Sequence, residues 1–259
     1  RADRRRLRSD AIESEARAWL ASHARLAPGR RAELDEPWPP STRIAREVLR
    51  LAFLTVAGEA PPRAWLHRAQ ALATGPRGAV LDGHRSLLAE RVHRGLLLVA
   101  PIARTTPAGP IALSDDGTAC PFGASGVAIE ARRQVLDAAP VFDPARRVAW
   151  ADAAGIALPL ALRAPRAGDR FDQHGQSVAL DLRRHLSGRH VPRLDRDRLP
   201  LVVDRDDRIV WAPGLDVAAF ARLAAGTRET LELRVTLGTM PAGSPCAASS
   251  YWRAPHPHP

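Results

Sequence analysis

The 259-residue chain contains no lysine, so all 38 residues counted together as Lys and Arg are arginines. The phosphate-binding loop G-x-x-x-x-G-K-[ST] requires a lysine, so this loop cannot occur in the sequence. The motifs H-E-x-x-H, C-x-x-C and G-x-S-x-G are missing as well. His256 and His258 alternate with proline near the end, which does not suggest a metal site. We therefore expect no catalytic residue and no metal ligand in this chain.

Cysteine and long apolar runs are also scarce. Cys120 and Cys246 are too few for a disulfide framework and lack metal-like spacing, so a cytoplasmic location is expected. The longest apolar run, residues 96–102, is interrupted by Pro101 and is far shorter than the ~20 residues that cross a bilayer. A signal peptide is not expected, because residues 9–15 are polar. The chain begins with Arg instead of Met, which suggests a fragment.

The charge balance favours a polyanionic partner. The formal net charge is +10 and the isoelectric point about 11.3. Codon use in a GC-rich genome would explain arginine in place of lysine, but it would not explain the excess of bases over acids. An excess of this size is typical of proteins that bind nucleic acid.

The first ninety residues predict a small helical bundle. Asp10 and Glu13 could form a capping box, and Glu13 could pair with Arg17 four residues later. Residues 28–40 are rich in Pro and predict a loop. An apolar stripe at helical spacing predicts a second helix from Ser41, and a third helix should follow Pro61 and Pro62.

The pattern then changes to short apolar runs. Residues 87–92 and 96–100 predict a β-hairpin, and residues 105–126 predict a loop. Further strands are predicted at 127–131, 158–162, 201–203, 209–211 and 231–235, with a short helix at 181–186. The predicted class is α+β, in four parts: a helical domain 1–90, a β-rich connector 91–160, a small mixed α/β C-terminal domain 161–236, and a disordered tail 237–259.

Residues 162–215 contain an ordered set of short motifs. An arginine-rich strand runs into Gly168-Asp169-Arg170-Phe171, and a glycine-containing loop follows at His174-Gly175. After a short basic helix come Val191-Pro192-Arg193, Arg196-Asp197, Pro200-Leu201 and Trp211-Ala212-Pro213-Gly214. No single motif is specific, but this order closely resembles the C-terminal domain of tRNA(Ile)-lysidine synthases. More weakly, residues 43–99 resemble the central helical domain of the same family.

The chain departs from the family pattern in two places. The family usually has Lys-Lys-Leu at the start of the basic helix, where this sequence has Val178-Ala179-Leu180. Arg183 and Arg184, one turn later, could replace the two missing charges. The second departure is the N-terminal ATP-pyrophosphatase domain with its Ser-Gly-Gly-x-Asp-Ser loop, which has no counterpart here.

The resemblance implies part of an ATP-dependent carbon–nitrogen ligase. In the full enzyme, ATP adenylates the wobble cytidine of an isoleucine tRNA, and the amine of free lysine displaces AMP. ATP and Mg²⁺ would bind to the missing domain, so this chain alone should bind no cofactor and should be inactive. Its own partner would be tRNA, with the helical part near the anticodon side and the C-terminal domain on the acceptor side.

A dense set of arginines supports RNA binding independently of the family. A guanidinium is a planar fork that suits phosphate oxygens, and such a set can follow an RNA backbone. The candidate tRNA-binding residues are Arg163, Arg166, Arg170, Arg183, Arg184, Arg189, Arg193, Arg196 and Arg198. The candidate structural residues of the motif are Gly168, Asp169, Pro192, Asp197, Pro200 and Gly214.

Two other hypotheses remain open at this point. One is a stand-alone, non-catalytic RNA-binding module that shares the C-terminal domain. The other is a structural interaction domain whose arginines form a solvated surface paired with neighbouring aspartates. The DNA upstream of the codon for Arg1 would separate the synthase from the module, because an in-frame Ser-Gly-Gly-x-Asp-Ser would favour the synthase.

Overall fold

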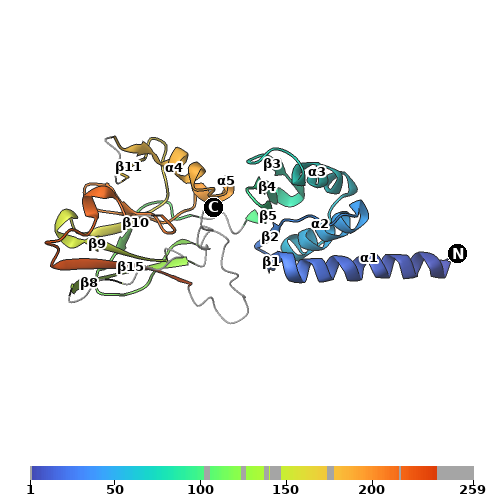
Figure 1. The fold of residues 1–259 in the computed structure, drawn as a ribbon, viewed down its shortest axis with the longest axis horizontal. Helices are drawn as coiled ribbons and strands as arrows, with labels where there is room; N and C mark the ends of the chain where they lie inside the picture. Colours follow the sequence, from blue (N-terminus) through green and yellow to red (C-terminus); the bar gives the residue numbers. More distant parts are fainter. Residues whose placement is uncertain are drawn as a thin grey trace. The chain divides into compact units, whose positions relative to one another are not determined.

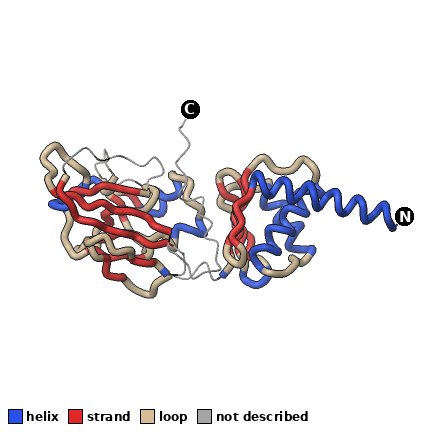
Figure 2. Tube along the Cα trace, turned by 90° about the horizontal axis from the view of Figure 1, so that it is seen from below, coloured by secondary structure: helices blue, strands red, loops and turns tan. Residues whose placement is uncertain are grey.

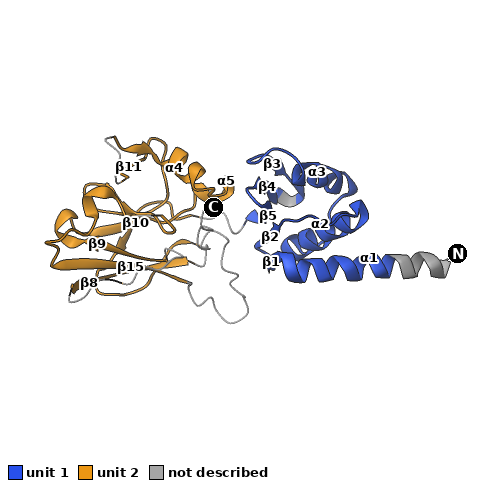
Figure 3. Ribbon diagram, viewed as in Figure 1, with its two compact units in different colours: residues 1–104, 243–247 blue, residues 105–242, 248–259 orange. Residues whose placement is uncertain are grey.

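The computed structural model describes residues 2–101, 106–123, 127–136, 140, 147–173, 178–215 and 217–237. These residues form two compact units, one ending at residue 101 and one starting at residue 106 (Figure 3). The predicted tail from residue 238 onward and the predicted loop at His174-Gly175 lie outside the described residues. No helix among the described residues is long and apolar enough to cross a membrane.

The first unit is a set of helices on one side of an antiparallel sheet (Figures 1 and 2). Its helices are α1 (Ala2–His23), α2 (Thr42–Ala57), α3 (Arg63–Ala73) and the short 3-10 helix η1 (His84–Ser86). Its strands are β1 (Ala24–Ala27), β2 (Arg31–Asp35), β3 (Val80–Asp82), β4 (Leu88–Val92) and β5 (Gly95–Val99). They are ordered β1-β2-β5-β4-β3 in the sheet, and all pairs are antiparallel.

The predicted second and third helices are confirmed. Ser41 is the N-cap of α2, and the helix ends at Gly58, whose φ of +77° is the left-handed conformation that glycine adopts without steric cost. Pro62 is the N-cap of α3. The hairpin predicted between residues 87 and 100 is also confirmed as β4 and β5. In α1, Arg17 pairs with Glu13 as predicted, at 2.7 Å.

Two predictions for this unit were wrong. Helix α1 already begins at Ala2, so Asp10 lies inside the helix and cannot cap its first turn. The unit is also more than a helical bundle, because residues 24–35 form the hairpin of β1 and β2 next to β5. Polar residues of this hairpin pair both across and along the strands: the carboxylate of Glu33 in β2 accepts hydrogen bonds from Arg25 of β1 and from Arg31 of β2, each at 2.8 Å.

The pairing of β2 with β5 depends on one glycine. A Cβ atom built on Gly95 would lie 1.8 Å from the carbonyl oxygen of Leu34, closer than any side chain can approach a backbone. Gly95 also has a φ of +144°, which L-residues rarely adopt. The glycine therefore lets the first residue of β5 lie directly against β2. The residues of β2 lie in the segment 28–40, which the sequence predicted as a loop.

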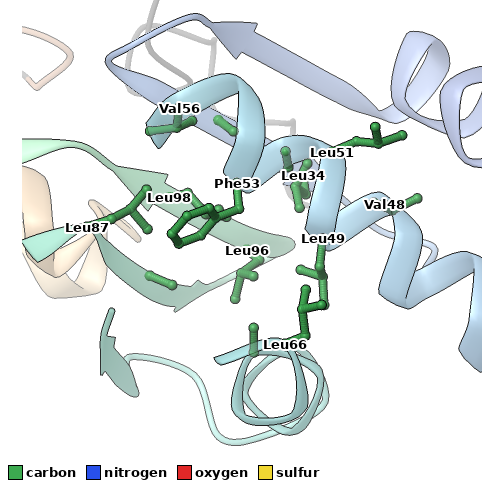
Figure 4. Packing of buried hydrophobic residues seen from close by; sticks show 14 of the residues in the cluster. Leu34, Val48, Leu49, Leu51, Phe53, Val56, Leu66, Leu87, Leu96 and Leu98 are labelled. Atoms are coloured by element: carbon green, nitrogen blue, oxygen red, sulfur yellow. The ribbon is translucent and has the colours of Figure 1, made fainter. Parts of the chain in front are cut away.

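The core of the first unit lies between α2, α3 and the sheet. Phe53 is fully buried in α2, and its ring meets Trp65 of α3 edge-on, with ring centroids 4.5 Å apart. Figure 4 shows Phe53 pointing from α2 toward Leu98 and Leu96 of β5. Phe53 thus joins both helices and the sheet in one contact, in keeping with the apolar stripe of α2.

Among the described residues, the second unit contains three antiparallel sheets and two short helices. Two sheets have four strands, ordered β14-β13-β10-β6 and β7-β8-β15-β9, and β11 pairs with β12. The strands are β6 (Ile111–Leu113), β7 (Cys120–Pro121), β8 (Val127–Val135), β9 (Val148–Asp152), β10 (Leu160–Arg163), β11 (Arg170–Phe171), β12 (Leu180–Asp181), β13 (Leu201–Val203), β14 (Ile209–Trp211) and β15 (Glu229–Leu237). The helices are α4 (Leu182–Gly188) and α5 (Arg193–Arg196), with 3-10 turns η4 (Ala153–Gly155) and η5 (Ala219–Ala221).

The sheet that contains β13 is covered on both faces. Val202 packs in the core shared with the β8–β15 sheet, whereas Leu201 and Val203 pack with α4 on the other side. Because successive side chains of a strand point to opposite faces, a strand covered on both sides must be apolar throughout. This arrangement explains the uninterrupted Leu-Val-Val sequence and leaves one side of α4 for solvent.

Some predicted boundaries differ from the observed elements. The divisions between residues 90 and 91 and between 160 and 161 fall inside β4 and β10. The predicted loop of residues 105–126 contains β6 and β7, each of which pairs within the second unit. These strands are only two or three residues long, so alternation of apolar and polar residues could not identify them.

A substitution at Phe53 tests the core of the first unit. Phe53→Ala should lower its free energy of unfolding by about 3–5 kcal/mol, because a large buried ring is removed and the surrounding helices and sheet can collapse only in part. Urea denaturation monitored by circular dichroism measures the change. Leu54→Ala, one residue later but more than one third exposed, is the matched control and should cost much less. Equal effects of both variants would contradict this packing.

Candidate nucleic-acid interface

The site begins at the tight turn between β10 and β11. The backbone N–H of Asp169 donates to the carbonyl of Arg166 at 3.3 Å, and Gly168 between them has a φ of +87°. This left-handed conformation favours glycine. The carboxylate of Asp169 accepts the backbone N–H of Arg166 at 2.7 Å, which closes the turn. Gly168 and Asp169 therefore shape the backbone here.

Arg163, at the end of β10, is buried and fully engaged within the protein. Its guanidinium donates to both carboxylate oxygens of Asp169, at 2.8 and 2.9 Å, and to Asp207 at 2.6 Å. Burial alone would lower the pKa of Arg163, but the hydrogen bonds to both aspartates outweigh burial and raise the pKa. With only 3% of its side chain exposed, Arg163 is a structural residue. This burial leaves little of the side chain for an RNA, and the contact of Arg163 with RNA stays a prediction.

The turn between β13 and β14 supplies the second partner of Arg163. Its first residue, Asp204, is buried and accepts backbone N–H groups of Asp206 and Arg208, each at 3.0 Å. Asp207 has a φ of +59°, and its second carboxylate oxygen accepts a hydrogen bond from Arg166 at 3.1 Å. The sequence indicated this turn, but not that it would hold an arginine forty-four residues earlier.

Helix α4 exposes two arginines because its other side is buried. The side chain of Asp181 caps the helix by accepting the backbone N–H of Arg184 at 2.8 Å. Leu182 and Leu186 lie in the core with Phe171, and α4 also buries a histidine that stacks on that ring. Arg183 and the side chain of Arg184 are therefore directed outward, and both are exposed.

Helix α5, next to α4 (Figure 1), carries Arg193 and Arg196, and Arg198 follows it. Pro192 is its N-cap, and Arg193 is exposed. Arg196 is partly buried, and its Nε donates to the carbonyl of Val191 at 2.9 Å. Arg198 is only 12% exposed and hydrogen bonds to the carbonyl of Leu194 and the carboxylate of Asp195. Little of Arg198 is thus open to an RNA, and its contact with RNA stays a prediction as well.

Six of the candidate arginines are exposed, once the buried Arg163 and the partly buried Arg196 and Arg198 are set aside. Arg170 donates from Nη2 to the carbonyl of Ala179 at 2.5 Å, yet its side chain is exposed. Val178, which precedes Ala179 in the chain, is exposed as well. The exposed arginine set consists of Arg166, Arg170, Arg183, Arg184, Arg189 and Arg193.

The candidate structural residues occupy turns and helix ends. Pro192 precedes α5, and Asp197 follows it as the C-cap. Pro200 is buried directly before β13, and Gly214 has a φ of +79°. Within the described parts of the chain, no cluster of three His, Cys, Asp or Glu residues could hold a metal ion. The chemistry that the site offers is the binding of anions by guanidinium groups.

The buried pair of Arg163 and Asp169 makes stability depend on pH. Burial alone would raise the pKa of Asp169, but its hydrogen bonds from Arg163 and Arg166 lower the pKa below the ordinary value of 3.8. A carboxyl whose pKa is lowered in the folded state stabilises the fold above its unfolded pKa. That stabilisation disappears as the pH falls through the folded pKa.

We predict that Asp169→Asn lowers the free energy of unfolding by about 3 kcal/mol at pH 7, because the buried Arg163 then keeps only one of its two charged partners, Asp207. The difference from the unchanged protein should shrink as the pH falls below about 4. Urea denaturation across a pH series measures it. Asp206→Asn, at an exposed pair 3.8 Å long, is the control and should change little. A difference that does not vary with pH would refute the assignment.

Parts of this chain are similar in sequence to known proteins. Residues 160–234 match the family described as the TilS substrate C-terminal domain. A tRNA(Ile)-lysidine synthase of Geobacillus kaustophilus is 42% identical over 69 residues, which are 27% of this chain and 15% of that protein. Another, of Symbiobacterium thermophilum, is 33% identical over 211 residues, which are 78% of this chain and 42% of that protein.

A solved structure of a TILS C-terminal domain is 28% identical, with a TM-score of 0.43, and covers 50% of this chain and 98% of that one. The chain spans less than half the length of either synthase named above. Residues 160–234 are thus a TilS substrate C-terminal domain, and most of this chain is homologous to tRNA(Ile)-lysidine synthases.

Proposed function

We propose that this chain is the tRNA-binding portion of a tRNA(Ile)-lysidine synthase, an ATP-dependent carbon–nitrogen ligase. The observation that carries the proposal is the exposed arginine set on a domain of the TilS substrate C-terminal family. The buried Arg163 and the largely buried Arg198 already have carboxylate partners, so they would contribute to the scaffold. The exposed residues are the ones that a nucleic acid can reach.

The contribution of this chain to the reaction would be orientation. Guanidinium groups on α4 and α5 would bind phosphate oxygens and fix the register of the tRNA without reading its sequence. In the full enzyme, ATP would adenylate the wobble cytidine and the amine of lysine would displace AMP. ATP and Mg²⁺ would bind to the ATP-pyrophosphatase domain. Holding the tRNA so that its target base meets that domain lowers the entropic barrier of the reaction.

This chain alone should not form lysidine. The reason is that its sequence contains neither the phosphate-binding loop nor the Ser-Gly-Gly-x-Asp-Ser loop of the ATP-pyrophosphatase domain. Incorporation of labelled lysine into an isoleucine tRNA transcript measures the activity, with a full-length synthase as the positive control. ATP-dependent incorporation by the purified chain would refute this part of the proposal.

Joint replacement of Arg183 and Arg184 by alanine should weaken tRNA binding. Removing one arginine–phosphate interaction should reduce affinity on the order of tenfold, and the dependence of log K on log salt should become shallower by roughly 0.7 to 0.9 for each phosphate released. Affinity should fall by a similar factor for unrelated RNAs, because phosphate contacts position without specifying. The measurement is fluorescence anisotropy with labelled tRNA across a salt series.

The matched control replaces Arg222 and Arg228 by alanine, which removes the same charge from exposed positions outside α4 and α5. It should leave the salt dependence nearly unchanged. If Arg183 and Arg184 can be replaced with no more effect than the control, in a protein that remains folded by circular dichroism, these arginines are a solvated surface and the proposal fails.

A further inference from the structure

The arginines of the candidate interface have two kinds of carboxylate partner. Asp169 and Asp195 face arginines within the protein, with about one tenth of each carboxylate side chain exposed. Asp197 pairs with Arg183 in the open, where the two side chains are 65% and 56% exposed. An exposed ion pair contributes little to stability, since water and salt screen it. The scaffold therefore does not depend on Asp197, in contrast to Asp169.

The pair links the first turn of α4 to the C-cap of α5. Nη2 of Arg183 donates to Oδ1 of Asp197 at 3.1 Å. Among the residues that the structure describes, no other side chain takes the remaining N–H groups of Arg183. A carboxylate and a phosphate present the same kind of anionic oxygen to a guanidinium. Asp197 thus occupies Arg183 in the way that a phosphate would.

Arg184 provides an internal comparison. It is exposed on the same turn of α4, and within the described part of the chain no carboxylate pairs with its side chain. The backbone of both arginines is already fixed by the helix and by the cap at Asp181. Asp197 is therefore not needed to place Arg183, and once a phosphate is bound its charge would lie close to the phosphate and repel it.

We propose that Asp197 limits the affinity for tRNA by competing with the RNA phosphate for Arg183. This inference rests on the proposed function. In the free protein Asp197 neutralises one of the contact arginines. Binding of tRNA must displace Asp197, and its carboxylate then favours release of the tRNA. The opposite role, in which Asp197 holds Arg183 ready for phosphate, predicts the opposite sign for its removal.

Asp197→Asn should tighten binding of an isoleucine tRNA transcript by about two- to fivefold at low salt, the range expected from releasing one exposed pair. Asp197→Ser should do the same. It removes the carboxylate with a different side chain, so the test does not depend on how the asparagine variant folds. Both should fold normally by circular dichroism. Unchanged or weaker binding by both folded variants would overturn the proposal.

A double-mutant cycle separates competition from a general decrease in negative charge. In the Arg183→Ala background, Asp197→Asn should no longer improve binding, because the arginine for which it competes is gone. A gain that persists there, or an equal gain from the exposed control Asp206→Asn, would overturn competition for Arg183. If Arg183→Ala, Arg184→Ala and their combination all leave tRNA binding intact, the proposed function itself fails. If they weaken binding while Asp197→Asn gives no gain, only the competitor role fails.

Discussion

The interface depends on the burial of one guanidinium, that of Arg163. Removing a charge from water is costly unless an opposite charge and good hydrogen bonds replace the water. Asp169 supplies two hydrogen bonds and Asp207 a third, so the turn after β10 and the turn after β13 must both approach β10. The same requirement fixes Gly168 and Arg166, because the carboxylate of Asp169 that binds Arg163 also closes their turn.

The layered packing of the second unit decides which side chains reach solvent. The strand β13 is buried on both faces, against a second sheet on one side and α4 on the other. Helix α4 has only seven residues, so packing and its Asp181 cap, more than helix propensity, hold it in place. Since Leu182 and Leu186 must face the sheet, Arg183 and Arg184 between them have to face away.

Local sequence patterns were sufficient to predict a helix or strand where the residues of that element alone determine its structure. The stripe of α2, the hairpin of β4 and β5 and the strands β13 and β14 were predicted close to their observed bounds. The strands β1 and β2 were missed because they carry charged residues that only become satisfied by one another, such as Arg25 with Glu33. This pairing joins residues on two strands, so the pattern of apolar and polar residues along the chain does not reveal it.

The candidate arginines show the same limit of prediction from sequence, because contacts with distant residues decide which of them are exposed. Arg163 and Arg166 are three residues apart and look alike in sequence, yet one is buried and the other exposed. Both pair with Asp207, more than forty residues further along the chain, but only Arg163 lies in a strand, at the end of β10 beside β13. Charge density in a sequence therefore indicates a polyanionic partner, but it overstates the number of arginines available to that partner.

Arginine suits both roles for a single physical reason. Its five N–H donors lie in one plane and stay charged, so a buried guanidinium can hold two carboxylates at once, as Arg163 does. The same planar fork on an exposed helix can accept a phosphate with little rearrangement. In a chain without lysine, the scaffold and the surface draw on one residue type. What distinguishes them is whether the opposing carboxylate is buried with the guanidinium or, like Asp197, remains in water where an anion can replace it.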